Sequence, residues 1–306
     1  MLLVTGATGY LGAVLVTLLR DEGLQPRAVV RAEARAAALP EGVPWAVADL
    51  SDREALTRAA DGCTGVFHLA ASVGHDAAET RALNVTGTGN VLAAARAAGV
   101  PRFVLTSTSA ASVDPTGLVD ERATGGTALV DPYSTSKAEA ERLTLAAADL
   151  ETVVVNPVNI YGPSPAGPHS YNGLFAAAAA GEVAEVVDAP VGWVLAEDVA
   201  LGHLLAFRRG EPGRRYVLCG EVAPFGRLLH GYAQLVGSPH RVRLLAPGAE
   251  LGPDASTFAR RSEVYGKLGP VRVDDAGARA LGFAPRGVDE GLRRTAEWLP
   301  TALAGR

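Results

Sequence analysis

The chain has 306 residues, of which 48% are hydrophobic and 20% are charged. This composition is typical of a globular protein and excludes a disordered or fibrous chain. The formal net charge is −5 and the 28 basic residues are scattered, so a broad binding surface for nucleic acid is excluded as well. The two cysteines, Cys63 and Cys219, lack the spacing of a zinc site or a disulfide scaffold, and we therefore expect no metal and a reducing compartment.

The first 19 residues are apolar enough to raise the question of a membrane or signal segment. Glycines at positions 6, 9 and 12 interrupt this stretch, and no basic residues precede it. The stretch is too short and too broken to span a bilayer. We expect a cytoplasmic protein that does not associate with membranes.

Short apolar runs alternate with helical patterns along the first half of the chain. Strands are predicted at residues 1–5, 27–30, 45–48, 65–70, 102–107 and 152–155, and helices at 11–22, 53–60, 76–98 and 132–148. The strands are almost continuously apolar, as expected for strands that are covered on both faces. The pattern predicts an α/β fold with a doubly wound, Rossmann-like parallel sheet.

After residue 162 the sequence changes to an irregular loop, residues 163–173, that is rich in turn-forming residues. Beyond it we predict strands at 215–218 and 242–245, and helices at 172–180, 224–236, 274–281 and 288–303. We expect a dinucleotide-binding core over residues 1–160 and a smaller C-terminal substrate lobe over residues 161–306. Some segments of this lobe are expected to return to the core sheet.

A glycine-rich turn follows the first predicted strand and precedes the first predicted helix. Gly6, Gly9 and Gly12 would let the backbone turn tightly and approach a pyrophosphate, whose charge the free amides at a helix N-terminus stabilise. The spacing is GxxGxxG, whereas the archetypal dinucleotide fold has GxGxxG. The strand–turn–helix context nevertheless predicts a dinucleotide site.

The end of the second predicted strand indicates which dinucleotide binds. In NAD-binding folds an acidic side chain usually bonds the adenosine ribose there, but this chain has Arg31. A guanidinium matches a 2′-phosphate in charge and geometry, so the sequence favours NADP(H) over NAD(H). Two alternatives are that Glu33 bonds the ribose and that Arg31 is a solvated surface residue. Asp49, at the end of the third strand, is either a partner of the adenine amino group or an acid at the start of the next helix.

The segment from Tyr133 to Lys137 places a phenol and an ammonium four residues apart in a predicted helix. Residues at this spacing share one helix face, so both groups would face the same cleft. A nearby positive charge favours the phenolate, which makes a tyrosine usable as an acid or base near neutral pH. Lys137 is one of two lysines in a chain whose basic residues are otherwise arginine, and arginine could not titrate in the same way. This bias toward arginine also indicates a GC-rich bacterial genome.

Several short motifs occur together and in order: TGATGYLG at 5–12, HLAA at 68–71, NVTGTGNVL at 84–92, RFVLTSTSA at 102–110, YSTSK at 133–137 and NPVNIYGP at 156–163. In this combination the chain resembles the extended short-chain dehydrogenases/reductases, also called the NAD-dependent epimerase/dehydratase family. The resemblance covers residues 1–205, and the remainder matches only in general texture.

The resemblance implies roles for individual residues. Tyr133 would be the general acid/base, and Lys137 would hold the nicotinamide ribose and lower the pKa of Tyr133. Thr108 would supply the hydroxyl that polarises the substrate carbonyl, although Ser107 or Ser109 could take this role. The residues implied to line the cofactor are Gly6, Thr8, Gly9, Tyr10, Leu11, Gly12, Arg31, Asp49, Leu50, Ala70, Ala71, Thr106, Tyr133, Lys137, Asn156, Pro157 and Val158. Those expected to contact the substrate are Ser72, Ser109, Asn159, His169 and Tyr171.

Departures from the family pattern narrow the expected activity. Members that dehydrate nucleotide sugars carry acidic residues where this chain has Ser109 and Ala110. Many epimerases have arginine at the position of Asn156 and an acidic residue at that of Arg31. These departures favour the carbonyl reductases of the family, such as the dihydroflavonol-reductase-like enzymes. Because loop 163–173 carries aromatic and few charged residues, we expect an NADPH-dependent ketoreductase for a ketone or aldehyde of a neutral, bulky small molecule.

Two other functions stay open at this point. One is a nucleotide-sugar 4-epimerase, which would hold its cofactor tightly and show no net consumption of NADPH. The other is a non-catalytic, dinucleotide-sensing protein, which the retained Tyr133 and Lys137 disfavour. In each case the partner is a small molecule, and the protein is expected to be a monomer or a homodimer.

Overall fold

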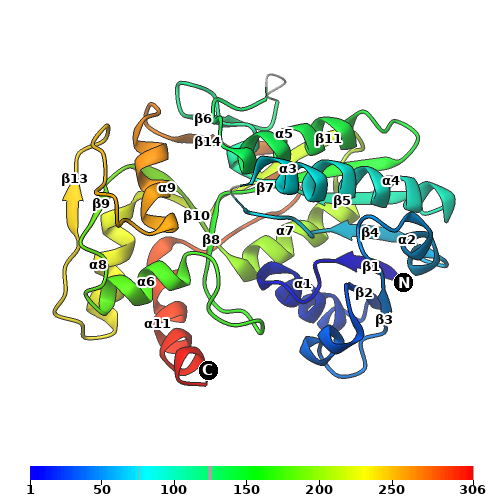
Figure 1. The fold of residues 1–306 in the computed structure, drawn as a ribbon, viewed down its shortest axis with the longest axis horizontal. Coiled ribbons are helices and arrows are strands. Elements are labelled where there is room, and N and C mark those ends of the chain that lie inside the picture. Colours follow the sequence, from blue (N-terminus) through cyan, green and yellow to red (C-terminus); the bar gives the residue numbers. More distant parts are fainter. Residues whose placement is uncertain (75, 123–125, 306) are drawn as a thin grey trace.

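The structure is a computed structural model that describes residues 1–74, 76–122 and 126–305. Its centre is a seven-stranded sheet with the order β11–β7–β5–β4–β1–β2–β3, in which all neighbours are parallel (Figure 1). The strands are β1 (Leu2–Thr5), β2 (Pro26–Val30), β3 (Trp45–Val47), β4 (Gly65–His68), β5 (Arg102–Thr106), β7 (Glu151–Pro157) and β11 (Arg214–Leu218). The order reverses between β1 and β4, which is the topological switch point of a doubly wound fold. The predicted Rossmann-like sheet is confirmed.

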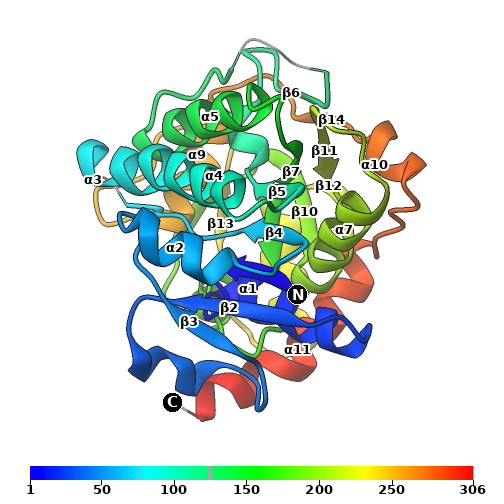
Figure 2. The same cartoon turned by 90° about the vertical axis from the view of Figure 1, so that its right-hand side faces the viewer.

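Helices cover both faces of this sheet, and each face has its own apolar core (Figure 2). One face carries α1 and α7, and the other carries α2, α4 and α5. In β4, Phe67 belongs to the core under α1 and α7, whereas Val66 belongs to the core under α2 and α4. Burial on both faces explains why the strands are almost continuously apolar. The bounds of the helices are α1 (Tyr10–Asp21), α2 (Arg53–Ala60), α4 (Gly87–Ala97), α5 (Pro132–Leu145) and α7 (Ala196–Arg209).

The helix predicted over residues 76–98 is present but changes its winding. α3 (Ala77–Arg81) continues through a π-helical turn (Ala82–Thr86) into α4. This wider turn carries Asn84, whose side chain accepts from the Ser72 amide at 2.8 Å and donates to the Ser72 carbonyl at 2.9 Å. Single π-helical turns are rare and occur frequently at functional sites. Here the turn fixes the loop that follows β4.

Apart from β7, α7 and β11, which belong to the central sheet and its helical cover, the second half of the chain builds a smaller lobe beside the sheet (Figure 1). Its core is aromatic, and the buried Trp193 ring packs against Phe225 and Tyr171 with centroids 5.1 and 5.0 Å apart. Three small sheets are associated with it: β12–β10–β8, β13–β9 and β14–β6. The remaining elements are β6 (Leu118–Asp120), β8 (Asn159–Tyr161), β9 (Glu185–Val187), β10 (Pro190–Leu195), β12 (Glu221–Pro224), β13 (Arg243–Leu245), β14 (Arg272–Asp274), α6 (Asn172–Ala179), α8 (Phe225–Leu235), α9 (Thr257–Gly266), α10 (Ala276–Ala280), α11 (Val288–Ala304) and 3-10 turns over Glu33–Ala38 and Ser109–Ala111.

The second half was predicted less completely than the first. α6, α8, α10 and α11 lie where helices were predicted, and β11 and β13 lie where strands were predicted. Helices α7 and α9 and several strands, among them β8, β10 and β12, were not predicted. β8 and β12 are short, with three and four residues, and each pairs with one edge of the six-residue β10. The predicted boundary at residue 160 stays a prediction.

The sequence predicts neither a membrane-spanning helix nor a metal site. Among the described residues, no helix has both the length and the apolar character needed to cross a membrane. Across the same ranges, His, Cys, Asp and Glu side chains form no group that could hold a metal ion.

Two histidines lie inside the core, between hydrogen-bond partners that suit the neutral ring. His203 accepts from the Thr106 hydroxyl at 2.7 Å, and its other nitrogen donates to a backbone carbonyl one turn earlier. His68 lies between the hydroxyls of Thr5 and Thr88, at 2.7 and 3.0 Å. Burial lowers the pKa of His203 to about 4 and that of His68 to about 3. Both rings therefore stay neutral in the folded protein at any physiological pH.

This arrangement predicts a loss of stability in mild acid. Below about pH 6.5 the unfolded chain protonates both histidines while the folded protein does not, so the unfolded state binds more protons. The free energy of unfolding should fall by about 1.4 kcal/mol per pH unit for each histidine, as the pH drops from about 6.5 toward the folded pKa values. Urea unfolding across this range measures the slope. His203→Gln should flatten it, and an unchanged slope in that variant would contradict the prediction.

Candidate active site

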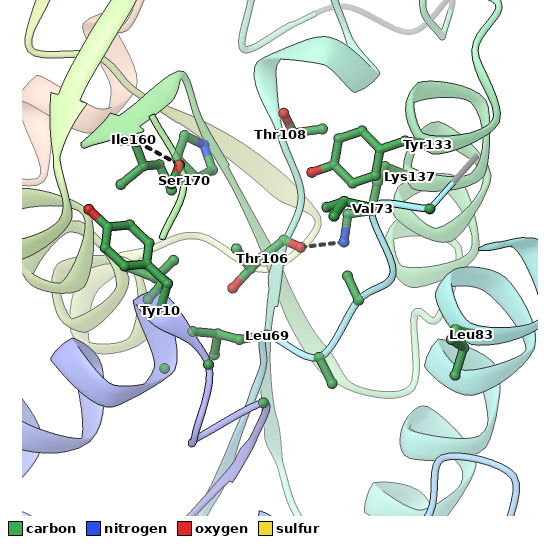
Figure 3. A pocket seen from close by; sticks show the side chains of 18 of the residues that line it. Tyr10, Leu69, Val73, Leu83, Thr106, Thr108, Tyr133, Lys137, Ile160 and Ser170 are labelled. Atoms are coloured by element: carbon green, nitrogen blue, oxygen red, sulfur yellow. Dashed lines mark hydrogen bonds between the residues drawn. The ribbon is translucent and has the colours of Figure 1, made fainter. Parts of the chain in front are cut away.

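A cavity of about 1080 Å³ lies at the carboxyl ends of the sheet strands, between the sheet and the C-terminal lobe (Figure 3). Ligands of doubly wound folds bind at this edge, outside the switch point. Most of the predicted site residues line the cavity. They are Gly6, Thr8, Gly9, Tyr10, Leu11, Gly12, Arg31, Asp49, Leu50, Ala70, Ala71, Thr106, Thr108, Tyr133, Lys137, Pro157, Val158, Asn159 and Tyr171.

The glycine turn brings the backbone of β1 close to the loop after β4. Gly6 has a φ of +71°, and a Cβ there would lie 2.7 Å from the Ala70 amide nitrogen. A Cβ at Gly12 would overlap the carbonyl oxygen of Gly6. Gly9 caps α1 without a side-chain hydrogen bond, so the amides of the first turn face the cavity edge without a competing side chain. The turn can therefore close only with glycine at positions 6 and 12, and the cradle of backbone amides that it forms fits a pyrophosphate.

Two arginines line the far end of the cavity. Arg31 follows β2, and Arg35 comes from the short 3-10 turn after it. Arg35 was missed because nothing in the sequence shows that this turn brings it back toward Arg31. Glu33, the alternative ribose partner, is not among the lining residues. Asp49 lines the cavity while accepting from the Ser51 amide at 2.9 Å and the Ser51 hydroxyl at 2.6 Å, and these bonds hold its pKa below the ordinary value.

Lys137 is buried below the centre of the cavity. Its Nζ donates to the Thr106 carbonyl oxygen at 2.6 Å, as Figure 3 shows. Burial lowers the pKa of Lys137 to about 8, while the carboxylate of Glu141, one turn along α5, acts in the opposite direction. A buried ammonium needs such partners, because an isolated charge in the interior is costly. The ammonium is thus fixed at the end of β5.

The Tyr133 hydroxyl points into the cavity above Lys137 (Figure 3). Burial raises the pKa of Tyr133, whereas the charge of Arg261 and a hydrogen bond with the Thr108 side chain lower it. The guanidinium carbon of Arg261 lies 5.4 Å from the centre of the Tyr133 ring. Burial has the largest effect, so the pKa of Tyr133 is raised in this structure, whereas the charge of Lys137 was predicted to lower it. The cation that lies over the ring is Arg261. Tyr133 and Thr108, predicted as a pair, do lie together.

Four predicted residues do not line the cavity. The amide of Asn156 donates to the Thr108 carbonyl at 3.0 Å and to Glu141 at 2.8 Å, so Asn156 supports the site from behind. Ser72 is bonded through its backbone to Asn84, and the Ser109 hydroxyl is bonded to Tyr265. The fourth is His169.

The loop 163–173 contributes less to the cavity than predicted. The Asn172 amide donates to the carbonyls of His169 and Gly162, at 2.7 and 3.1 Å, and Ser164 donates to the Tyr10 carbonyl at 2.7 Å. These bonds close the loop onto itself and onto α1, which removes Asn172 and Ser164 from the substrate side. Ser170, which was not predicted, lines the cavity in a left-handed conformation with a φ of 59°.

The C-terminal lobe forms one wall of the cavity, and this wall was not predicted from the sequence. Helix α9 places several side chains on the cavity, opposite α5. Ser256 caps this helix by accepting from the Ala259 amide at 3.2 Å. The cap and the spacing of Phe258, Arg261 and Tyr265, three and four residues apart, are signals that could have predicted a helix with one face on the site. The other lining residues from this region are Ala255, Arg260 and Val264.

The parallel sheet, the glycine cradle and the Tyr133–Lys137 pair at one cavity define a Rossmann-type oxidoreductase that uses a nicotinamide dinucleotide. The model of the NAD dependent epimerase/dehydratase family matches residues 2–219. The chain belongs to this family, and the resemblance noted in the sequence is confirmed.

Known relatives agree with this assignment. The chain is 35% identical to a putative dihydroflavonol 4-reductase of Synechocystis sp., over 77% of this chain and 72% of that one. It is also 35% identical to the sterol demethylase protein B of Methylococcus capsulatus, over 80% and 77% of the two chains. The structure is similar to that of UDP-glucose 4-epimerase from Thermus thermophilus in complex with NAD, with a TM-score of 0.77, 26% identity and coverage of 98% and 99%.

The glycine cradle can be tested with one substitution. Gly12→Ala should destabilise the protein by about 1–3 kcal/mol, because the added methyl group forces the turn open. It should also weaken dinucleotide binding at least about tenfold, since the amides no longer converge. Urea unfolding and fluorescence titration with NADPH measure the two effects. The matched control is Gly89→Ala in α4, whose Cβ would make only an ordinary contact of 3.5 Å with Leu143; equal effects of both variants would contradict the prediction.

Proposed function

We propose that the protein is an NADPH-dependent reductase that acts on a ketone or aldehyde of a neutral, bulky small molecule. The observation that carries the proposal is the Tyr133 hydroxyl, which lies in the cavity beside Thr108 and above the buried Lys137. These groups are where a reductase needs a proton donor, a carbonyl-polarising hydroxyl and a fixed cation.

The chain's own residues position and protonate the substrate. The Thr108 hydroxyl polarises the carbonyl by donating to its oxygen, and Tyr133 Oη gives its proton to the same oxygen as negative charge develops there. Lys137, held at the Thr106 carbonyl, would hold the sugar next to the nicotinamide of a bound dinucleotide. The bound nicotinamide supplies the hydride.

The two arginines at the far end of the cavity support NADPH over NADH. Arg31 and Arg35 together offer two guanidinium groups where the adenosine ribose of a dinucleotide held by the glycine cradle would lie. A phosphate on that ribose suits this charge, and guanidinium groups bond phosphates in a bidentate way.

The substrate side of the cavity supports a bulky, neutral molecule. Its wall carries large apolar and aromatic side chains, and both of its arginines have partners. Arg261 is paired with Asp131 at 3.7 Å, and the guanidinium of Arg260 donates to two backbone carbonyls, at 2.8 and 2.7 Å. A substrate that carries a diphosphate would need free cations there. The apolar and aromatic lining residues on this side are Val73, Leu83, Ile160, Tyr171, Ala255, Phe258, Val264 and Tyr265.

The second candidate is a sugar-nucleotide epimerase, which the likeness to the UDP-glucose 4-epimerase structure favours. An epimerase returns the hydride to its substrate and consumes no cofactor. The third, a non-catalytic dinucleotide sensor, is disfavoured because Tyr133 and Lys137 both lie at the cavity.

A turnover assay tests the proposal. Purified protein should oxidise NADPH in the presence of ketones from a panel of aromatic, polycyclic and long-chain compounds. It should not epimerise UDP-glucose. Tyr133→Phe should lower kcat by about 10² to 10⁴, because the proton donor is lost. The control is Tyr216→Phe, whose hydroxyl lies outside the cavity and accepts from the Glu211 amide at 2.9 Å. Undiminished reduction by Tyr133→Phe, or epimerisation without NADPH loss, would overturn the proposal.

Cofactor preference has its own test. Arg31→Ala and Arg35→Ala should each weaken NADPH binding about 10–100-fold, the value of a charge-assisted hydrogen bond, and should leave NADH binding nearly unchanged. Calorimetric titration with both dinucleotides measures this. Arg20→Ala, an exposed substitution on α1 that is not at the cavity, is the control. A wild-type preference for NADH that survives both substitutions would contradict the prediction.

A further inference from the structure

Tyr133 belongs to one helix of the site and contacts a second helix from a distant part of the chain. Its own helix, α5, starts at the edge of the sheet, and α9 approaches from the C-terminal lobe. From α9, the guanidinium carbon of Arg261 lies 5.4 Å from the centre of the Tyr133 ring. This is within the range of a cation–π contact, and the side chain of Arg261 is only 23% exposed, so solvent screens its charge weakly.

Asp131 sets the direction of that guanidinium. It caps α5 by accepting from the Ser134 amide at 3.0 Å and from the Ser134 hydroxyl at 2.6 Å. The same carboxylate lies 3.7 Å from a terminal nitrogen of Arg261. Because Asp131 is fixed by the helix start and lies two residues before Tyr133, the ion pair holds Arg261 over the phenol ring. The contact therefore joins the two lobes at the point where the phenol enters the cavity.

Lys137 is engaged elsewhere. Its Nζ donates to the Thr106 carbonyl at 2.6 Å, and the carboxylate that acts on its pKa is that of Glu141 on the same helix. A lysine in this state anchors the helix to β5 and faces the floor of the cavity. The side chain that presents a positive charge to the face of the Tyr133 ring is Arg261.

We propose that Arg261 is a positioning residue for Tyr133: it holds the phenol in place and favours its ionised form across the interface between the two lobes. The inference rests on the proposed function only in taking Tyr133 as the acid/base. The packing of α9 against α5 would then determine how readily Tyr133 loses its proton. The phenol would be most easily ionised when the C-terminal lobe is packed against the sheet.

Other groups around the phenol act in both directions. The hydrogen bond with Thr108 favours the ionised form, as Arg261 does, whereas Asp131 and Tyr265 disfavour it. Tyr171 also faces the phenol, and Lys137 lies one turn away on the same helix. Burial raises the pKa values of Tyr171 and Tyr265, so both stay neutral near neutral pH and Tyr265 acts only where it ionises itself, at high pH. Near neutral pH the competing charge is that of Asp131. Arg261 exerts the largest influence that favours ionisation.

The ionisation of Tyr133 can be measured without any substrate. Fluorotyrosine incorporated in place of the seven tyrosines lowers phenol pKa values, and fluorine NMR then reports each ring as the pH is raised. The Tyr133 signal is assigned by its absence in Tyr133→Phe. Arg261→Gln should raise the Tyr133 midpoint by about one pH unit or more, a tenfold change in its ionisation constant. Arg261→Lys, which keeps the charge without the planar group, should give a smaller shift.

The matched control is the adjacent Arg260→Gln. Arg260 also lines the cavity, but its guanidinium donates to the carbonyls of Gly252 and Pro253 at 2.8 and 2.7 Å. It should leave the Tyr133 midpoint unchanged. A shift in Arg261→Gln no larger than in Arg260→Gln, or a shift to lower pH, would overturn the inference. Arg261→Met serves as a second neutral variant, with the same expected shift, if Arg261→Gln does not fold.

The titration separates this inference from the proposed function. A raised midpoint in protein that reduces no ketone supports the role of Arg261 and removes the reductase assignment. An unmoved midpoint in protein that reduces ketones through Tyr133 does the reverse. If the enzyme is active, carbonyl reduction should decline at high pH, because reduction needs the protonated phenol. In Arg261→Gln this decline should occur at a higher pH, shifted by as much as the Tyr133 midpoint.

Discussion

The hydrogen bond from the Lys137 ammonium to the Thr106 carbonyl determines the geometry of the whole site. It is 2.6 Å long, buried, and joins helix α5 to the end of strand β5. Because a buried ammonium without partners is costly, α5 cannot rotate or slide away from the strand without a large loss of free energy. The helix carries Tyr133 and the strand leads to Thr108, so one bond fixes the positions of both hydroxyl groups. On the other side of β5, the Thr106 hydroxyl is bonded to His203 of α7 at 2.7 Å.

A second layer of buried polar groups supports this bond. Asn156 at the end of β7 links the Thr108 carbonyl to Glu141, and Glu141 is also ion-paired with Arg215 of β11. Three neighbouring strands, β5, β7 and β11, are thereby connected to α5 behind the cavity. Networks of this kind specify one arrangement strongly, because any alternative leaves buried polar groups unpaired. Asn156 occupies a motif position that suggested contact with the cofactor, yet its side-chain nitrogen donates both of its hydrogen bonds within the protein framework.

The two lobes contribute different chemistry to the cavity. The sheet edge supplies backbone amides, hydroxyls and a buried ammonium, all held by short-range hydrogen bonds. The C-terminal lobe supplies an apolar wall and the guanidinium of Arg261, which rest on an aromatic core around Trp193. The lobe is attached to the core by hydrogen bonds such as that from the Tyr10 hydroxyl to the Gly162 carbonyl, at 2.8 Å. The wall from the C-terminal lobe therefore packs on a different apolar core from the one beneath the glycine cradle.

The sequence by itself determined the parallel sheet, the glycine turn and the Tyr133–Lys137 pair, because each depends on local patterns. Apolar runs form strands, glycines mark close backbone approach, and a spacing of four residues defines a helix face. Only the tertiary structure decided that Arg261 and Arg35 join the cavity and that Asn156, Ser72, Ser109 and His169 do not. Arg261 is 128 residues from Tyr133 along the chain, and their contact depends on how the two lobes pack. No periodicity or motif within one segment encodes such a contact, since it arises from the summed packing of elements that are distant in the sequence.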